Sequence, residues 1–169
     1  MAWKRNVLVV ANVTAASDEL LSALRARATN DPATFTVIVP ATPFGGGREA
    51  ALAKVEEAVG RLRAAGLEAS GEVGDGDPMI AVSEKWDPRE YDEIVVCTLP
   101  TGISKWLHAG LPERISKLTG APCTHVVAQP PKTPVPTAPP RAHDGASDVL
   151  GPLAPLAWGA PSRAGRDQR

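Results

Sequence analysis

The stretch EIVVCTLPTGISKWLHAGLPERISKLTGAPCTHVV, residues 93–127, decides the fold. Its two ends, residues 94–97 and 124–127, are short runs rich in β-branched residues, which are typical of buried parallel strands. Between them, residues 110–112 (GLP) open a helix and Gly120 ends it, because proline is tolerated in the first helical turn and glycine favours the C-terminal cap. The pattern predicts a strand, a long loop, a helix and a second strand. The N-terminus of such a helix, where it faces a strand end, attracts anions.

The rest of the chain alternates between the same two patterns. Three more strands are predicted where apolar residues run together or alternate with polar ones: residues 6–11, 34–39 and 67–73. Three more helices are predicted where apolar residues recur on one face between capping residues: residues 18–28, 48–65 and 78–86. Five strands that alternate with four helices form a parallel sheet with helices on both faces, joined by right-handed crossovers.

The helical patterns also indicate which side chains face the sheet. In two of the helices the apolar residues expected on the inner face are Leu52, Val55, Val59 and Leu62, followed by Met79, Ile80 and Val82. Charged residues of the helix at 48–65, Lys54 and Arg61 among them, are expected on the opposite face. The three glycines at 45–47 lack the Lys-Ser/Thr of a P-loop, so they indicate a flexible connection rather than a phosphate site.

Three segments resemble universal stress proteins. YDEIVVCT at 91–98 is similar to the ADLIVVGT that precedes the nucleotide loop of that family, and GLPERISKLTGAPCTHVV at 110–127 is similar to its GSVAERVLRHAPCPVLVV. The turn GDP at 76–78, followed by an apolar helix, also resembles the corresponding turn in the family. The resemblance spans residues 6–128. It implies a single Rossmann-like, doubly wound, five-stranded parallel sheet with strand order 3-2-1-4-5, in one α/β domain over residues 1–128.

The nucleotide loop of the family keeps its spacing in this chain but loses much of its chemistry. ATP-binding members carry glycine, two residues, glycine, nine residues, then glycine and a serine or threonine. Here that spacing falls on Cys97, Pro100, Gly110 and Leu111, and the family's strand-one aspartate falls on Asn12. Pro100 has no N–H to donate, and Leu111 replaces a hydroxyl with an alkyl group. We therefore expect a vestigial nucleotide site at these five residues and no bound cofactor, with ATP as the alternative.

The position of this site follows from the implied strand order. Ligands of doubly wound sheets bind beyond the carboxyl ends of the strands where the order reverses, here between the strands at 6–11 and 94–97. Residues 11–13 and 97–101 are expected to line that crevice. Lys105 and Arg114 are candidates to restore the missing positive charge, although a flexible ammonium does not replace fixed backbone donors.

The composition limits the partners and the compartment that the chain is expected to have. The chain has 169 residues and a formal net charge of −1, with both signs interleaved, which argues against nucleic-acid or anionic-membrane partners. Its N-terminus passes directly into a strand pattern rather than a signal-peptide core, which favours a cytoplasmic protein. Cys97 and Cys123 are then expected to be reduced and buried. Cys123 and His125 share a strand face, but two ligands alone do not make a metal site, so no metal is predicted.

Residues 129–169 differ in composition from the rest of the chain. They hold nine of the seventeen prolines and many alanines, which predicts a largely disordered tail. Within it, VLGPLAPLAW at 149–158 is too apolar for a plain spacer. Docking on this domain, on a second subunit or on another protein partner are open alternatives, as is a disordered end with incidental leucines.

These observations predict a non-enzymatic, universal-stress-protein-like module that acts by homodimerisation or partner binding. The alternative is an ATP-binding regulatory stress protein whose loop tolerates the replacements. A hydrolase or transferase on the same fold is disfavoured, because His108, His125 and His143 are scattered and no serine or cysteine lies in a nucleophile elbow. His125 is expected in the core or an interface, and His108 in the loop before the last helix.

Overall fold

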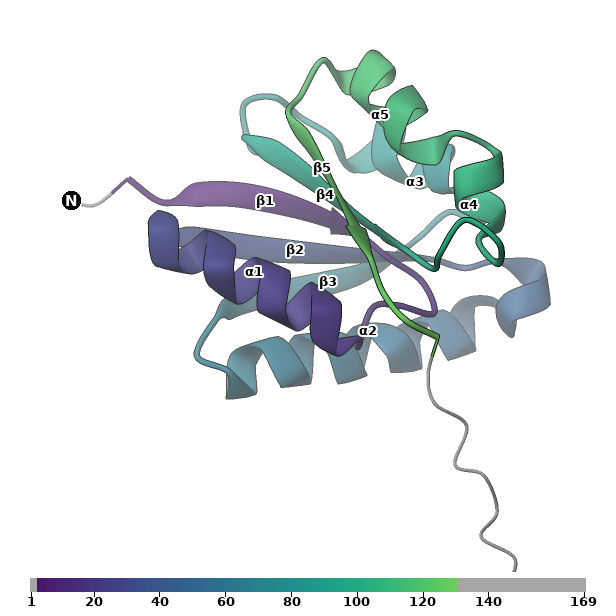
Figure 1. Cartoon of the computed structure of the whole chain (residues 1–169), viewed down its shortest axis with the longest axis horizontal. Coiled ribbons are helices and arrows are strands. Elements are labelled where there is room, and N and C mark those ends of the chain that lie inside the picture. The colour runs from purple at the N-terminus through teal and green to yellow at the C-terminus, as the bar shows by residue number, and fades with distance from the viewer. Residues whose placement is uncertain (1–2, 131–169) are drawn as a thin grey trace, which may run out of the picture. The chain divides into compact units, whose positions relative to one another are not determined.

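The elements of the chain follow the alternation that the sequence predicts (Figure 1). The structure is a computed structural model, and it describes residues 3–130. The expectations for the tail beyond residue 130, which include the apolar segment 149–158 and His143, lie outside the described residues.

All nine predicted elements are present, with their bounds shifted by at most two residues. In chain order the elements are β1 (Arg5–Val10), α1 (Asp18–Asn30), β2 (Ala33–Pro40), the 3-10 turn η1 (Pro43–Gly45), α2 (Gly47–Ala64), β3 (Glu68–Gly74), α3 (Pro78–Lys85), β4 (Glu93–Thr98), α4 (Lys105–His108), α5 (Leu111–Thr119) and β5 (Cys123–Val127). The two additions, η1 and α4, lie in segments that the sequence predicted as loops.

The sheet has the expected topology. All its pairings are parallel, and the strand order is β3-β2-β1-β4-β5. The central strand β1 pairs with β2 on one side and with β4 on the other. Helices α1 and α2 cover one face, while α3 and α5 cover the other (Figure 1). The prediction of a doubly wound five-stranded sheet is confirmed.

The core lies in two layers on either side of β1. Val7 and Val9 belong to the cluster under α1 and α2, whereas Leu8 and Val10 belong to the cluster under α3 and α5. All four side chains are fully buried. This two-sided burial explains why the strand reads as a continuous apolar run rather than an alternating one.

Several helix and strand ends follow local signals in the sequence. The Ser17 side chain accepts a hydrogen bond from the Leu20 N–H at the start of α1, and the Asp77 side chain accepts one from the Met79 N–H at the start of α3. Gly120 ends α5 in the left-handed conformation, at φ 66°. Helix α1 runs two residues further than expected, because the Asp31 N–H still bonds to the Arg27 carbonyl before Pro32 stops the helix.

Two inner-face predictions are wrong by one residue. Leu52 is 49% exposed, and Ala51 is buried in its place. A Cβ on Gly71 of β3 would lie 2.7 Å from Val55, so α2 sits against that glycine with Ala51 turned toward the sheet. In α3, Ile80 is 45% exposed while Ala81 and Val82 are buried, because Ala81 packs directly against Gly74.

The three glycines at 45–47 form a defined turn instead of the flexible connection that the sequence predicted. The Gly45 and Gly47 N–H groups both donate to the Thr42 carbonyl, at 2.9 and 3.2 Å. Gly46 and Gly47 take left-handed backbone angles, which favour glycine. A Cβ on Gly45 would lie 2.4 Å from Thr42 Oγ1, so position 45 also requires the absence of a side chain.

Cys97 and Cys123 are both free thiols, as expected. Cys123 pairs with Ile94, three residues before Cys97, which corresponds to about 10 Å along the strand. Their side chains also lie in different core clusters on opposite faces of the sheet. Cys97 is buried as predicted, but Cys123 is only partly buried, because β5 is an edge strand.

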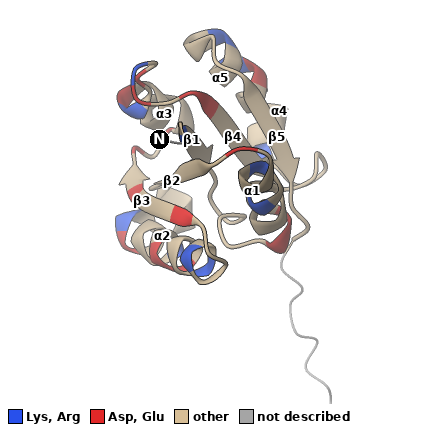
Figure 2. Ribbon diagram, turned by 90° about the vertical axis from the view of Figure 1, so that its left-hand side faces the viewer, with Lys and Arg blue, Asp and Glu red and all other residues tan. Residues whose placement is uncertain are grey.

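No helix within residues 3–130 has the length and apolar character needed to cross a membrane. Lys and Arg residues are mixed with Asp and Glu residues along α2, α3 and α5 (Figure 2). Neither sign of charge is therefore segregated to one of these helices.

The glycine contacts predict opposite effects for two Gly→Ala changes. Gly74→Ala would place a Cβ 2.6 Å from Ala81 Cβ and 2.8 Å from Ile38 Cγ2, so the free energy of unfolding should fall by about 1–3 kcal/mol. The matched control, Gly60→Ala within α2, meets nothing within 4 Å and should raise it by roughly 0.5–1 kcal/mol. Urea unfolding followed by circular dichroism measures both. A Gly74→Ala variant as stable as Gly60→Ala would contradict the close α3–β3 contact.

Candidate functional site

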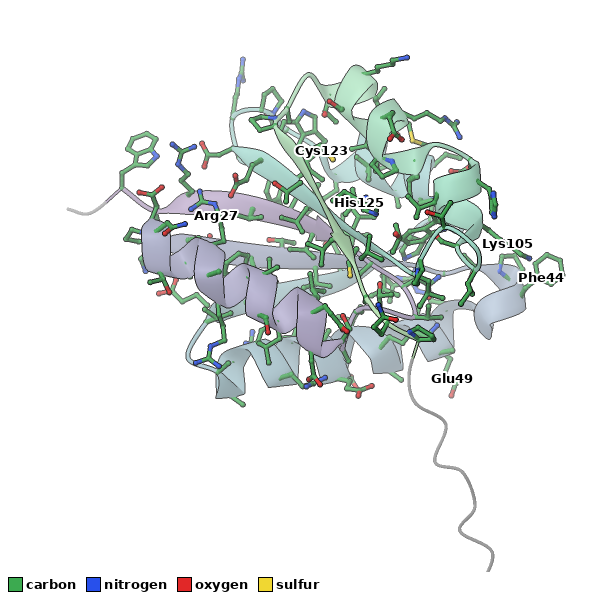
Figure 3. The ribbon with its side chains drawn as sticks, in the orientation of Figure 1. Arg27, Phe44, Glu49, Lys105, Cys123 and His125 are labelled. Carbon is green, nitrogen blue, oxygen red and sulfur yellow. The ribbon has the colours of Figure 1, made fainter. Side chains whose placement is uncertain are left out.

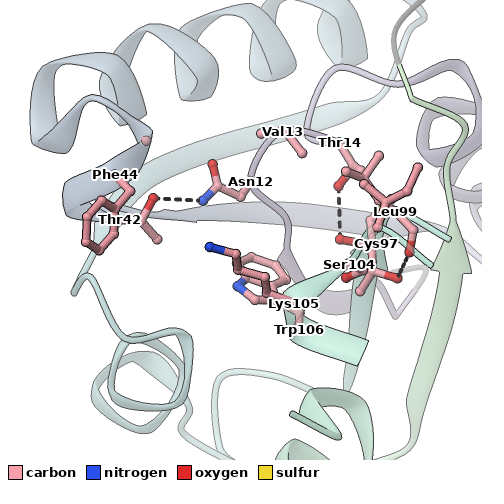
Figure 4. Close-up of a pocket in the computed structure, with 13 residues that line it drawn as sticks. Asn12, Val13, Thr14, Thr42, Phe44, Cys97, Leu99, Ser104, Lys105 and Trp106 are labelled. Atoms are coloured by element: carbon pink, nitrogen blue, oxygen red, sulfur yellow. Dashed lines mark hydrogen bonds between the residues drawn. The ribbon is translucent and has the colours of Figure 1, made fainter. Parts of the chain in front are cut away.

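A hollow of about 350 Å³ lies at the carboxyl end of the sheet, where the strand order reverses between β1 and β4 (Figure 4). Three segments line it, each following the carboxyl end of a strand: residues 12–14 after β1, residues 42, 44 and 45 after β2, and residues 97–99 and 103–106 from β4 and the loop beyond it. This is the position at which doubly wound sheets bind ligands.

The five residues predicted as a vestigial nucleotide site do not all meet in this hollow. Asn12 and Cys97 line it, whereas Pro100, Gly110 and Leu111 do not. Gly110 is the left-handed N-cap of α5, with φ 62°. Leu111 is 2% exposed and packs in the core cluster under α3 and α5. The start of α5 is therefore set apart from the lining of the hollow.

The loop between β4 and α5 forms hydrogen bonds within itself. Ser104 caps the short helix α4 through its side chain, and the turn that precedes it is closed by the Pro100 carbonyl. The N–H donors bonded within the loop are those of Ile103 and Ser104 to Pro100 O (2.9 and 3.0 Å), Leu107 to Ser104 Oγ (3.3 Å), His108 to Ser104 O (3.2 Å), Ala109 to Lys105 O (3.1 Å) and Gly110 to Leu107 O (3.0 Å). A phosphate would have to compete with each of these bonds for its donor.

Asn12 lies in the wall formed by the loop after β1 and is bonded by Lys54, a lysine that the sequence pattern had placed on an outer helix face. Lys54 Nζ, from α2, donates to Asn12 Oδ1 at 2.8 Å, and Asn12 Nδ2 lies 3.4 Å from Thr42 Oγ1. An ammonium can only donate, so the atom of Asn12 that faces Lys54 is the oxygen and its NH₂ faces Thr42 and the hollow. Helical periodicity cannot reveal this contact, because Asn12 lies 42 residues away in the loop after β1.

Arg61 also departs from the outer face on which it was expected. Its guanidinium donates to the Ala16 carbonyl and pairs with Asp18, so it fixes the loop that leads from β1 into α1. This contact supports the wall of the hollow formed by residues 12–14 without reaching its lining.

The polar groups on the floor of the hollow have structural roles. Thr14 Oγ1 donates to the Cys97 carbonyl at 2.9 Å and ties the loop after β1 to the end of β4 (Figure 4). Burial raises the pKa of the Cys97 thiol, so the thiol stays protonated at neutral pH. The lining contains no histidine, aspartate or glutamate. No histidine or carboxylate of the lining is therefore available to activate Ser104 or Cys97 as a nucleophile.

The rim is apolar and exposed. Phe44 is 99% exposed, Val13 57% and Ile103 56%. Phe44 and Lys105 lie on the same side of the molecule (Figure 3), and the half-buried Trp106 lies next to Lys105 in the lining. Sequence patterns gave no sign of Phe44 or Trp106, because each lies in a loop segment without periodicity.

His125 lies outside this hollow. It is exposed on β5, so the expectation of a core position is wrong, and its Nε2 is 2.7 Å from Thr98 Oγ1. His125 and Cys123 line a separate, shallow hollow beside α5. Burial, and then the charge of Glu113, raises the pKa of the Cys123 thiol. Residues 3–130 contain no group of three or more His, Cys, Asp or Glu side chains placed to hold a metal ion.

The fold and the position of the hollow define a doubly wound α/β protein with a hollow at its switch point. No protein family model matches the sequence, and no curated protein is similar to it in sequence. Solved structures that are similar in fold include two universal stress proteins. A universal stress protein in complex with cAMP has a TM-score of 0.51 and 20% identity, over 76% of this chain and 99% of that one. A universal stress protein from Archaeoglobus fulgidus has a TM-score of 0.52 and 17% identity, over 72% of this chain and 93% of that one.

Within the doubly wound class, the chain has the fold of the universal stress proteins. The strand order that the resemblance implied is confirmed by the pairing of the strands.

Proposed function

We propose that the chain is a universal-stress-protein-like module of the cytoplasm that works without catalysis, by dimerising and binding partners, and whose nucleotide crevice no longer holds a polyphosphate. In this proposal residues 1–128 form the working domain and residues 129–169 a tail that is free to contact a protein partner. The observation that carries it is the hydrogen bonding of the loop between β4 and α5, where six backbone N–H groups already have acceptors in the loop itself.

A polyphosphate needs several backbone donors, and the loop between β4 and α5 does not supply them. A triphosphate carries several negative charges and is normally held by a row of backbone donors, often at a helix N-terminus. Here Pro100 and Pro112 supply no N–H, and Leu111 is buried in the core. Lys105 is a single exposed ammonium on a flexible stem, which does not replace such a row.

The states of two candidate nucleophiles in the lining, Ser104 and Cys97, support a role other than catalysis. Ser104 Oγ accepts the Leu107 N–H as a helix cap, and the pKa of Cys97 is raised by burial. The hollow therefore supplies binding surface rather than a reactive group.

The edges of the sheet support dimerisation through β5. The other edge strand, β3, carries Glu68 and Glu72, which pair with Lys4 and Lys85, and charges of this kind discourage strand pairing. Strand β5 reads CTHVV, has no acidic or lysine residue, and leaves Val127 42% exposed. A second copy of β5 could extend the sheet across a two-fold axis.

Nucleotide binding is the second candidate function, as in an ATP-binding regulatory stress protein. One similar structure is a complex with cAMP, and Lys105 points into the hollow here. A cyclic monophosphate carries a single charge and needs fewer donors than ATP, so it is the nucleotide that this crevice would suit best.

The first test is a calorimetric titration of the full chain with ATP and magnesium, and separately with cAMP. We expect no saturable ATP binding up to about 1 mM, a limit of roughly 4 kcal/mol. The triple variant Cys97→Gly, Pro100→Gly and Leu111→Ser should not recover binding, because Leu111 faces the core instead of the hollow and the six loop N–H groups keep their own acceptors. Leu111 is buried, so a cooperative thermal melt must accompany this variant. Saturable ATP binding by the unaltered chain would refute the loss, and saturation by cAMP alone would favour the second candidate.

The second test concerns the β5 edge. Sedimentation velocity should find the full chain dimeric, and Val127→Lys should make it monomeric, because a lysine on the edge opposes strand pairing. Ser70→Lys places the same charge on the exposed β3 edge and should leave the dimer intact. A chain that stays monomeric at all concentrations, or that is dissociated equally by both changes, would contradict dimerisation through β5.

A further inference from the structure

We propose that the hollow at the switch point binds a small apolar monoanion of the aryl or alkyl carboxylate class, with Lys105 and Asn12 as the donors to its carboxylate. This inference rests on the proposed function, since it assigns a ligand to a crevice that has lost its polyphosphate donors.

Exposed apolar side chains line part of the hollow. Phe44, Val13 and Ile103 line one concave surface, and each of these apolar side chains is more than half exposed. Phe44 is not at the tip of a loose loop, because η1 is closed by two N–H groups on the Thr42 carbonyl. Apolar walls around a hollow of about 350 Å³ are typical of small-molecule sites.

Lys105 gives the hollow a positive charge that has no acidic partner within residues 3–130. Figure 4 shows Lys105 pointing across the hollow toward Asn12 and Thr42. No carboxylate of residues 3–130 forms an ion pair with Lys105 or with Lys54. The lining likewise contains no acidic residue. An anion entering the hollow would therefore meet attraction without a competing carboxylate.

Asn12 is oriented to donate to that anion. Lys54 fixes the Asn12 oxygen at 2.8 Å, which leaves the NH₂ directed to the side of the hollow. One of its two hydrogens has only a long contact, 3.4 Å to Thr42 Oγ1. The ammonium of Lys54 also polarises the amide through its oxygen and strengthens the NH₂ as a donor. One amide NH₂ and one ammonium can together bind a single carboxylate, and the surrounding apolar side chains can contact the ring or alkyl chain of the same ligand.

The experiment uses 2-naphthoate and 2-naphthalenemethanol, which share one ring system and differ in charge. Each is titrated into the ¹⁵N-labelled full chain, and amide shifts of residues 12–14, 44 and 103–106 are followed by NMR. We expect saturable shifts with naphthoate and about tenfold weaker binding of the alcohol. Lys105→Met should weaken naphthoate by a similar factor without affecting the alcohol. Lys117→Met, an exposed lysine of α5 that lines the separate hollow beside His125, is the matched control and should change neither.

Three results would overturn the proposal: no saturable naphthoate shifts in this hollow, equal affinity for acid and alcohol, or naphthoate binding unaffected by Lys105→Met. Tighter binding of cAMP than of naphthoate at the same residues would also overturn it, in favour of a nucleotide ligand. An ATP titration of the same sample reports on the proposed function separately. If neither ATP nor naphthoate saturates, the ligand class is wrong while the loss of polyphosphate binding stands. If ATP saturates, the proposed function itself is wrong.

Discussion

The burial of β1 on both faces is the constraint on which the rest of the structure depends. Residues 7–11 are entirely inaccessible to solvent, so this strand needs a parallel neighbour on each side and a helical layer above and below. The chain supplies β2 and β4 as neighbours by crossing over opposite faces. Because the two crossovers leave in opposite directions, the segments that follow β1 and β4 diverge at their carboxyl ends. The hollow between Asn12 and Cys97 is a direct consequence of that divergence.

The loop after β4 determines which side chains line one edge of this hollow. With Pro100 at its start and Ser104 as a cap, the loop folds into a turn and the one-turn helix α4 and bonds its N–H groups to its own acceptors. It presents Ile103, Lys105 and Trp106 to the hollow instead of a row of backbone donors. The crevice thus keeps the position that the fold gives it but has an apolar, singly charged character. That combination underlies both the proposed loss of polyphosphate binding and the proposed ligand class.

Much of the fold could be predicted because its signals are short-range. Caps such as Ser17 and Asp77, the glycine at 120 and the continuous apolar run of β1 each act within a few residues. The strand order came from a resemblance to a family, since periodicity alone does not order strands.

The features that the sequence did not reveal depend on contacts between distant segments. The choice of Ala51 over Leu52 depends on the close approach of α2 to Gly71, and a helical period cannot separate adjacent positions. The contact between Lys54 and Asn12 joins residues 42 apart, and the burial of Leu111 depends on packing under α3. The hollow therefore lies at the carboxyl edge where topology predicted a crevice, while the contact between Lys54 and Asn12 in its wall came only from the structure.

Amide hydrogen exchange in the loop after β4 tests the central claim most directly. The claim is that the N–H groups of residues 103, 104 and 107–110 are bonded within the loop, so they should be protected in the free protein and unchanged by ATP and magnesium. Gly102, whose N–H has no acceptor among the described residues, provides the fast-exchanging reference. Exchange of all six groups as fast as Gly102 in the free chain, followed by protection when ATP is added, would contradict the account.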